Sequence, residues 1–327
     1  MHRRRTGNSN ANRKYMNIYS VSDIKKIIQS DTKVAGNEYV KVSRPANPDN
    51  ANNNSIIFIN RDGRYNSEIL QTTAANIIVC HLSENLSPSL LAKKCFLLTD
   101  NPKLVYARLI KKLFPQKSPL FQTHPTAVIS PNAKIAKKVH IGPFTYIGQA
   151  VIETGTVIYG HCHIYDGVYI GKNSILHAGC IIGADGFGYV KNENKEYEQF
   201  PQIGKVIIED NVEIGANCCV DKGALNDTII KSGVKIDNLV HIGHNSVVGK
   251  NTMITANVVF SGSTVVGDRC YFAPNVTSNG HLKIGNNVFV GTGSVITKDI
   301  PDGETWVGSP ARPIDEFRKI QTKIKKI

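Results

Sequence analysis

The sequence has few aromatic residues, no cysteine pairing pattern and no long hydrophobic run. Aromatic residues make up 7% of the 327 residues, and only one of them is Trp. This composition suits a core built from Val and Ile better than a large globular core. The seven Cys are scattered without the regular spacing of a disulfide framework, which indicates a reducing, cytoplasmic compartment. Because no apolar run is long enough to cross a bilayer, we expect no membrane span.

Acidic residues are scarce at both ends of the chain, which explains much of the formal net charge of +13. Residues 1–14 carry five basic side chains and no acid, and residues 312–327 carry six basic against two acidic ones. Such tails are either solvated or meet an acidic partner, for example an acidic carrier protein or a phosphate-bearing substrate. Aromatic residues do not interleave with the basic runs, so we expect no nucleic-acid partner.

What the sequence has in abundance is an apolar residue at every sixth position. Between residues 230 and 296, eleven of the twelve sixth positions are apolar: Ile230, Ile236, Ile242, Val248, Ile254, Phe260, Val266, Phe272, Ile284, Val290 and Ile296, with Ser278 as the exception. A helix would scatter these positions around its axis, and an ordinary strand would need apolar residues at every second position. A period of six predicts a parallel β-helix, in which three short sides form a coil of ~18 residues.

The pattern divides a mainly β chain into four parts. Residues 1–16 are expected to form a disordered basic tail. In residues 17–118, strand-like runs alternate with helical segments, which predicts a small α/β domain. The β-helix is expected over residues 119–303, followed by a C-terminal extension with a short helix at residues 304–327. Residues 185–203 interrupt the hexads, and we expect a loop there that leaves the coil and carries function.

Spacing alone selects a candidate base among the His residues of the hexads. His244 lies two positions after the inward-pointing Ile242, so its side chain should lie at the surface, and Asp237 precedes it by seven residues. His281 lies 37 residues after His244, about two coils further on, and both imidazoles should project from the same side. A His oriented by a carboxylate is the usual general base. The alternative is a surface His without a catalytic task.

Two other motifs resemble a metal site and a dinucleotide-binding site, but neither is complete. In His161–Cys162–His163 the two imidazoles could share one face of a strand, but no third and fourth ligand follow at a metal-site spacing, so we expect no metal. The glycine-bearing run at residues 185–189 is not a dinucleotide fingerprint, because no βαβ unit surrounds it.

Six segments together resemble UDP-3-O-acylglucosamine N-acyltransferases of lipid A synthesis. They are Asn101–Arg108, Gly183–Tyr189, Pro201–Gly204, Asp221–Leu225 and the pairs Asp237–Asn238 and His244–Asn245, in the same order and spacing. The likeness covers roughly residues 20–315.

The resemblance implies a left-handed β-helix, a homotrimer and active sites between subunits. It implies transfer of a 3-hydroxyacyl group from acyl carrier protein to the amine of UDP-3-O-acylglucosamine. The acyl group would arrive on phosphopantetheine, so no permanently bound cofactor is expected. His244 matches the family's general base, Asp237 the assisting carboxylate and His281 a second active-site His. A backbone N–H near Gly262 is our candidate for holding the oxyanion.

The resemblance also implies substrate-binding residues in three places. Residues 17–118 would form a uridine-binding domain, and its base contacts would be Phe58, Asn60 and Tyr65. The interrupting loop would contribute Asp185, Phe187 and Tyr189. Two amides in the hexads, Asn238 and Asn245, complete the set.

Two other functions stay open at this point. The ending Gly308–Pro313 is shared with many sugar acyltransferases that use coenzyme A, so the chain could acylate a dTDP- or UDP-linked amino-deoxysugar for a surface glycan. The chain could also be a non-catalytic trimeric β-helix scaffold.

Overall fold

The structure is a computed structural model that describes residues 17–28, 31–60, 66–115 and 119–324. It divides into two compact units, one ending at Ser118 and the other beginning at Pro119. The expectation of a disordered tail at residues 1–16 lies outside the described residues.

The N-terminal unit is a small α/β domain around a five-stranded sheet in the order β2-β7-β6-β5-β4. Its β2 runs antiparallel to β7, and the other neighbours are parallel. The elements of this unit are β1 (Tyr19–Ser20), α1 (Val21–Lys25), β2 (Lys33–Gly36), β3 (Lys41–Val42), β4 (Arg44–Pro45), η1 (Pro48–Asn50), β5 (Ser55–Phe58), α2 (Asn66–Thr72), β6 (Ile77–His81), α3 (Pro88–Lys93), β7 (Cys95–Thr99) and α4 (Pro102–Leu113). Strands β5, β6 and β7 are almost wholly buried, as expected for parallel strands covered on both faces.

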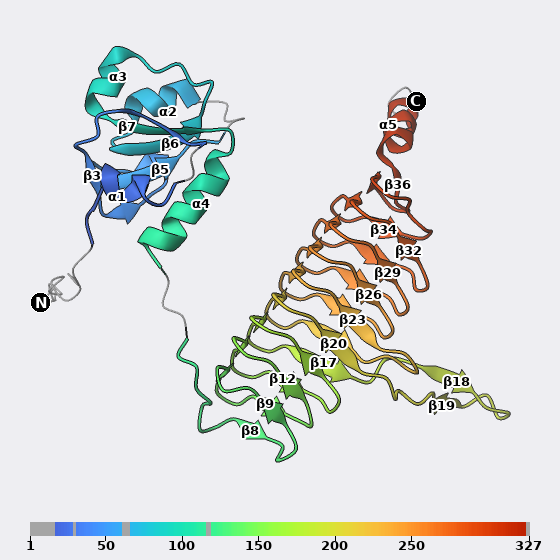
Figure 1. The fold of residues 1–327 in the computed structure, drawn as a ribbon. Coiled ribbons are helices and arrows are strands. Elements are labelled where there is room, and N and C mark those ends of the chain that lie inside the picture. The colour runs from blue at the N-terminus through green and yellow to red at the C-terminus, as the bar shows by residue number, and fades with distance from the viewer. Residues whose placement is uncertain (1–16, 29–30, 61–65, 116–118, 325–327) are drawn as a thin grey trace, which may run out of the picture. The chain divides into compact units, whose positions relative to one another are not determined.

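The second unit is a triangular β-helix with three parallel sheets (Figure 1). The chain passes in turn through the nine-stranded, the eight-stranded and the ten-stranded sheet. The nine-stranded sheet contains β8 (Val128–Ile129), β11 (Tyr146–Ile147), β14 (His163–Ile164), β17 (Ile181–Ala184), β22 (Cys219–Asp221), β25 (His241–Ile242), β28 (Val259–Phe260), β31 (Thr277–Ser278) and β34 (Val295–Ile296). The eight-stranded sheet contains β9 (Lys134–Ile135), β12 (Val151–Ile152), β15 (Tyr169–Ile170), β20 (Val206–Ile208), β23 (Thr228–Ile230), β26 (Val247–Val248), β29 (Val265–Val266) and β32 (Lys283–Ile284).

The ten-stranded sheet completes the prism and ends in an antiparallel pair, β35 with β36. Its strands are β10 (His140–Ile141), β13 (Val157–Ile158), β16 (Ile175–Leu176), β21 (Glu213–Ile214), β24 (Lys235–Ile236), β27 (Met253–Ile254), β30 (Tyr271–Phe272), β33 (Phe289–Val290), β35 (Thr305–Val307) and β36 (Arg312–Pro313). Helix α5 (Ile314–Ile324) follows, at the place where a short C-terminal helix was expected. None of the helices in the described part of the chain is long and apolar enough to cross a membrane.

The interior confirms the hexad pattern. All twelve sixth positions from Ile230 to Ile296 are at most 5% exposed, including the exception Ser278. Ser278 lies 3.4 Å from Thr264 between their hydroxyl oxygens, so its polar atom has a partner inside the coil. Each two-residue strand presents its second residue inward, which explains why the period is six rather than two.

Two of the three corners of the prism matter for function. The turn that leads from the ten-stranded to the nine-stranded sheet is called the Asp corner, because it holds Asp237. The turn that leads from the nine-stranded to the eight-stranded sheet is called the His corner, because it holds His244. Residues with φ near +60° close both corners, among them Leu239 at the first, and Asn245 and Ser263 at the second. Asn tolerates this region better than other side-chain-bearing residues, which explains its frequency in the turns.

The excursion at residues 185–203 is a hairpin as well as a loop. Strands β18 (Tyr189–Lys191) and β19 (Tyr197–Gln199) pair antiparallel and project from the His corner between β17 and β20 (Figure 1). The sequence predicted a departure from the coil here, but not the hairpin. Its alternation is too short to distinguish from a polar loop.

Candidate functional site

His244 lies at the His corner, half-buried, with its imidazole against the next coil. A β-carbon added at Gly262 would lie 2.5 Å from His244 Nε2. Such a distance is well inside van der Waals contact, so only glycine fits there without moving the ring. The Gly262 carbonyl accepts a hydrogen bond from the His281 N–H at 3.0 Å, whereas the Gly262 N–H donates none within the described residues. The glycine that contacts the imidazole therefore has an N–H without a hydrogen-bond partner in the described part of the chain.

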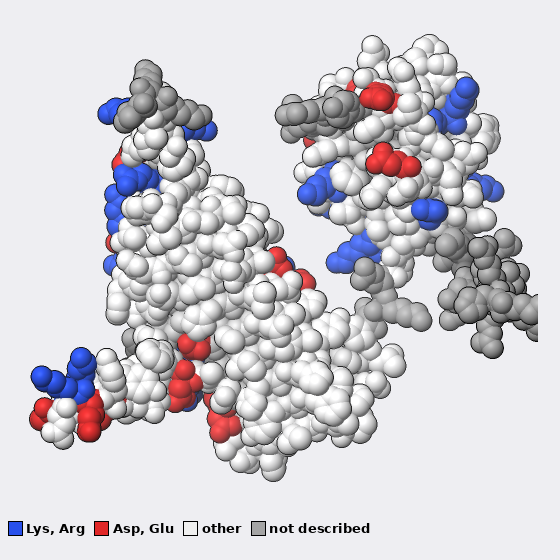
Figure 2. Space-filling view, turned by 180° about the vertical axis from the view of Figure 1, so that it is seen from behind, with Lys and Arg blue, Asp and Glu red and all other residues white. Residues whose placement is uncertain are grey.

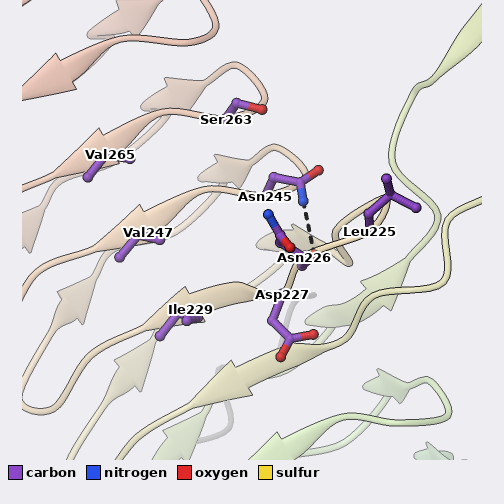
Figure 3. A pocket seen from close by; sticks show the side chains of 8 residues that line it. All are labelled: Leu225, Asn226, Asp227, Ile229, Asn245, Val247, Ser263 and Val265. Carbon is purple, nitrogen blue, oxygen red and sulfur yellow. Dashed lines mark hydrogen bonds between the residues drawn. The ribbon is translucent and has the colours of Figure 1, made fainter.

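The side chain of Asn245 fixes the orientation of that imidazole. Its Oδ1 lies 2.9 Å from His244 Nδ1 and also accepts a hydrogen bond from the Ala224 N–H at 3.0 Å. Its Nδ2 donates to the Asn226 carbonyl at 2.9 Å, drawn as a dashed line in Figure 3. These partners assign the amide orientation, because a flipped amide would face N–H against N–H. His244 Nδ1 must then carry the proton, which leaves a lone pair on Nε2, the nitrogen that lies against Gly262.

The excursion covers His244 from the other side. A β-carbon added at Gly186 would lie 2.5 Å from His244 Cβ and 2.8 Å from Gln202 Oε1. Gln202 is 7% exposed, and its Oε1 has no hydrogen-bond partner among the described residues. Asp185 forms an ion pair with Lys222 at 2.7 Å. The base of the hairpin is thus packed onto the His corner.

The carboxylate near His244 within one chain is Asp221, not Asp237. Asp221 ends β22 on the preceding coil, is 8% exposed, and lies 3.6 Å from His241 Nε2 through its Oδ2. Burial raises the pKa of Asp221, while the charges of His241 and His244 oppose that rise. The sequence showed Asp221 only as part of a resemblance. Asp221 could have been identified from the hexad pattern, because it is an acidic residue directly after the inward Val220 and at the same corner as His244.

Asp237 and Asn238 lie at the Asp corner, and strand β25 separates them from His244 in the chain. Asp237 Oδ1 accepts a hydrogen bond from the Asn238 N–H, and Asn238 Oδ1 accepts one from the Ala216 N–H, both at 2.7 Å. These bonds close a turn. Within a single chain the structure therefore separates Asp237 from the imidazole that the sequence paired it with.

His281 lies at the His corner as expected, but not at the position equivalent to His244. It occupies the φ +60° position that Asn245 and Ser263 occupy on earlier coils, and it is exposed. Its backbone bonds to Gly262. The two imidazoles thus share a corner while pointing from different positions of the turn.

The remaining binding candidates are distributed over both units. In the N-terminal unit, Phe58 is half-buried and its ring lies 4.9 Å from that of Tyr106 between centroids. Asn60 follows β5, and Tyr65 lies outside the described residues. On the hairpin, Phe187 is 87% exposed and its ring lies 5.0 Å from that of Tyr189.

A cavity of about 560 Å³ opens beside Asn245 on the outer face of the eight-stranded sheet. Figure 3 shows its lining: Leu225, Asn226, Asp227, Ile229, Asn245, Val247, Ser263 and Val265. Aliphatic side chains from β23, β26 and β29 form the floor, and polar side chains of the His corner form one edge. The arrangement offers an apolar surface next to the candidate base.

His161 and His163 make ring contacts. His161 lies 5.1 Å from Phe144 and His163 lies 4.6 Å from Tyr146, between ring centroids. Cys162 between them is buried in the interior. In the described part of the chain, no cluster of three or more His, Cys, Asp or Glu could hold a metal ion.

We expect Asp221→Asn to stabilise the fold increasingly as pH rises. Because burial raises the pKa of Asp221 in the folded state, the folded chain binds more protons than the unfolded chain. The free energy of unfolding therefore falls as pH rises above the usual Asp pKa of about 3.9. Asn removes this cost. The free energy of unfolding of the variant, measured in urea, should therefore increasingly exceed that of the wild type between pH 4 and neutral pH.

Asp302→Asn is the matched control, because hydrogen bonds from Asn286 lower the pKa of Asp302. Its difference from the wild type should have the opposite sign: a loss of stability that grows as pH rises to about 4 and stays constant above that pH. Equal slopes for the two variants would contradict the assignment of Asp221.

Comparison with known sequences identifies the family. Residues 205–238 match the family model described as the hexapeptide repeat of succinyl-transferase. The UDP-3-O-acylglucosamine N-acyltransferase of Coxiella burnetii (strain Dugway 5J108-111) is 38% identical over 304 residues, which cover 86% of this chain and 86% of that protein. The enzyme of the same name from Bordetella pertussis is 31% identical over 283 residues, covering 79% of this chain and 78% of its own.

Solved structures give the same fold. The UDP-N-acetylglucosamine O-acyltransferase of Moraxella catarrhalis RH4 superposes with a TM-score of 0.53 at 26% identity, over 60% of this chain and 77% of that one. The acyltransferase of Francisella novicida gives a TM-score of 0.54 at 26% identity, over 59% and 69%. The expected left-handed β-helix is thereby confirmed. With this likeness over most of its length, the chain is an acyltransferase and belongs to the UDP-3-O-acylglucosamine N-acyltransferase family.

Proposed function

We propose that the protein transfers a 3-hydroxyacyl group from acyl carrier protein to the amine of UDP-3-O-acylglucosamine, with His244 as the general base. The observation that carries this proposal is the set of contacts made by the two ring nitrogens of His244. Asn245 occupies Nδ1, and Nε2 faces Gly262, whose N–H has no hydrogen-bond partner among the described residues. A base and an oxyanion donor next to each other are what aminolysis of a thioester requires.

The reaction then proceeds in two steps. His244 Nε2 takes a proton from the amine as the nitrogen attacks the thioester carbonyl, and the carbonyl π electrons move onto oxygen. The Gly262 N–H donates a hydrogen bond to that oxyanion. As the intermediate collapses, the C–S bond breaks, the amide carbonyl re-forms, and the imidazolium returns its proton to the departing thiolate. Two neighbouring groups border this site: the His281 N–H, which is bonded to the Gly262 carbonyl, and Asp221, whose pKa is lowered by the charge of His244 against the larger effect of burial.

In a trimer, Asp237 of one copy would lie near His244 of the next copy, although the two residues are at different corners of a single chain. A rotation about an axis parallel to the β-helix, in front of the nine-stranded sheet, sets the Asp corner of one copy beside the His corner of the next. The composition of that sheet supports the arrangement, because the first residue of each of its strands points outward and none of these residues is Lys, Arg, Asp or Glu: Val128, Tyr146, His163, Ile181, Cys219, His241, Val259, Thr277 and Val295. In the view of Figure 2, the β-helix has a broad face with few charged side chains.

The proposed acceptor already carries an ester-linked acyl chain, which needs an apolar surface near the amine. The cavity floored by Ile229, Val247 and Val265 lies beside Asn245 and supports such an acceptor. The uridine would bind the N-terminal unit at Phe58, Asn60 and Tyr65. The acyl group arrives activated on phosphopantetheine, so the reaction needs no resident cofactor. We place it in the cytoplasm, where the seven free Cys remain reduced.

The proposal is tested by offering the purified protein 3-hydroxyacyl carrier protein and 3-hydroxyacyl-coenzyme A, each with UDP-3-O-acylglucosamine and with dTDP- and UDP-linked amino-deoxysugars. Mass spectrometry of the products should show N-acylation of UDP-3-O-acylglucosamine with the carrier-protein donor. Turnover only with coenzyme A and a deoxysugar would establish the surface-glycan alternative. No turnover with any pair, from a folded protein, would support the scaffold alternative.

Asn245→Ala is expected to lower kcat about 10²-fold with little change in KM, because the His244 ring loses the contact that fixes its tautomer and angle. Asn245→Asp should recover part of kcat, since a carboxylate also accepts from Nδ1–H. It should also move the acidic limb of the kcat/KM profile to higher pH, by stabilising imidazolium. Asn275→Ala, at another corner residue with φ near +60°, should leave the pH profile unchanged. Equal kcat and pH profiles for all three variants would contradict this role.

A further inference from the structure

The β18–β19 hairpin presents an aromatic face that nothing in the described part of this chain covers. The rings of Phe187 and Tyr189 lie 5.0 Å apart, and those of Tyr189 and Tyr197 lie 6.5 Å apart. Lys191 lies over the Tyr197 ring at 5.5 Å, and Tyr197 is 70% exposed. A two-stranded hairpin is marginal in water unless its apolar face packs against something. The exposed face therefore indicates a docking partner.

The same chain carries a second exposed aromatic surface, which we call the aromatic patch. It consists of Phe144, Tyr146, His161, His163 and Tyr165. The Phe144 ring contacts the His161 ring, and the His163 ring contacts those of both Tyr146 and Tyr165. The centroids of the contacting rings are 4.4–5.1 Å apart. The patch extends from the Asp corner across the outer face of the nine-stranded sheet.

The two surfaces lie at neighbouring levels along the β-helix but at different corners. The hairpin leaves the His corner directly after β17, and β17 pairs with β14, which pairs with β11. The patch is built on β11, β14 and the turns around them. A rotation that sets one copy's Asp corner beside the next copy's His corner keeps levels aligned, so it brings the hairpin of one copy to the patch of another.

We propose that the aromatic face of the hairpin docks on the aromatic patch of a second copy of this chain. The proposal rests on the trimer of the proposed function and adds which surfaces join the copies. Aromatic pairs and stacked imidazoles are typical of the centre of such interfaces. The aromatic face of the hairpin includes Lys191, and the five patch residues include no Lys or Arg that would repel it. Closed around an axis, this contact between unlike surfaces leaves no copy with an unpaired hairpin.

A cross-link between two different variants tests the contact. Tyr197→Cys and Tyr146→Cys chains with different tags are co-expressed, purified as mixed assemblies and oxidised. A disulfide between residues 197 and 146 of different copies, identified by peptide mass spectrometry, is the expected result. Each variant oxidised alone should give no linked pair at these positions, which also controls for the native Cys.

A second pair of variants tests the energetic role of the docked face. Tyr197→Arg should raise the protein concentration at which the trimer dissociates by about tenfold or more, as expected for loss of an aromatic anchor. Val190→Arg places the same charge on the other face of the hairpin and should change that concentration little. Light scattering over a dilution series measures both. Equal effects would contradict docking through the aromatic face.

The outcomes separate this inference from the proposed function. An active trimer without the cross-link would overturn the docking alone, and would leave substrate or carrier protein as the occupant of the hairpin. A cross-linked assembly without acyl transfer would overturn the proposed chemistry alone. A chain that stays monomeric at all concentrations would overturn the docking.

Discussion

Replacing His244 with Ala is expected to lower kcat/KM for acyl transfer about 10²–10⁴-fold while the β-helix stays folded. The ring lies at the surface of the His corner and not in the hydrophobic interior, so its loss leaves no cavity in the core. The amine must still lose a proton when it attacks the thioester, and in the variant only water is left to accept it. Steady-state kinetics with 3-hydroxyacyl carrier protein measure the effect, and thermal unfolding shows that the fold is retained.

His177→Ala is the matched control for that experiment. His177 is another imidazole on the outside of the β-helix, paired with Glu213 at 3.2 Å between Nε2 and Oε1, and it follows a strand of the ten-stranded sheet. Its removal should leave kcat/KM within about twofold of the wild type, as is usual for surface positions away from a site. If His244→Ala behaved like His177→Ala, the general-base proposal would be wrong and the scaffold reading would regain support.

Replacing Gly262 with Val is expected to cost at least about 10²-fold in kcat. A β-carbon there would lie 2.5 Å from His244 Nε2 and 2.6 Å from its Cε1. Since Asn245 holds the other side of the ring, the imidazole can make room only by leaving the position in which Nε2 faces the reacting amine. The added side chain also crowds the N–H that is proposed to hold the oxyanion.

The double variant His244→Ala/Gly262→Val distinguishes this mechanism from general damage to the coil. If the valine acts by displacing the imidazole, it should cost much less once the imidazole is absent, and the two losses should not add. Fully additive losses in kcat, or a marked drop in thermal stability of the single Gly262→Val variant, would contradict the proposed role of this glycine.

The interior of the β-helix could be predicted from the sequence because one physical requirement repeats along it. Every inward position must be apolar and must stack on its equivalent in the next coil, so Ile230, Ile236 and their successors reveal the period directly. The N-terminal unit was also recognisable as α/β, although the cap of its first helix was not. That cap is Ser20, which forms a capping box with Asp23.

The site was less predictable, because it depends on which corners the chain brings together. Asp237 precedes His244 by seven positions, and this spacing alone suggested that the carboxylate lies beside the imidazole. In a triangular coil that spacing crosses one whole side of the prism, so the two residues lie at different corners. Asp221 is further away in sequence, yet it lies near His244 because the coils stack. The contact of Asn245 with His244 depends on a hydrogen-bond network through Ala224 and Asn226, which no periodicity encodes.

In the proposed trimer, one active site combines the His corner of one copy with the Asp corner of another, and subunit mixing tests this most directly. His244→Ala and Asp237→Ala chains, each inactive in its own assembly, are co-expressed with different tags and purified as mixed trimers. Each mixed trimer contains two copies of one variant and one copy of the other, so one of its three sites has both native residues, and we predict recovery of about a third of the wild-type rate. If mixed trimers form and their activity stays at the level of the separate variants, the two residues do not share a site between copies.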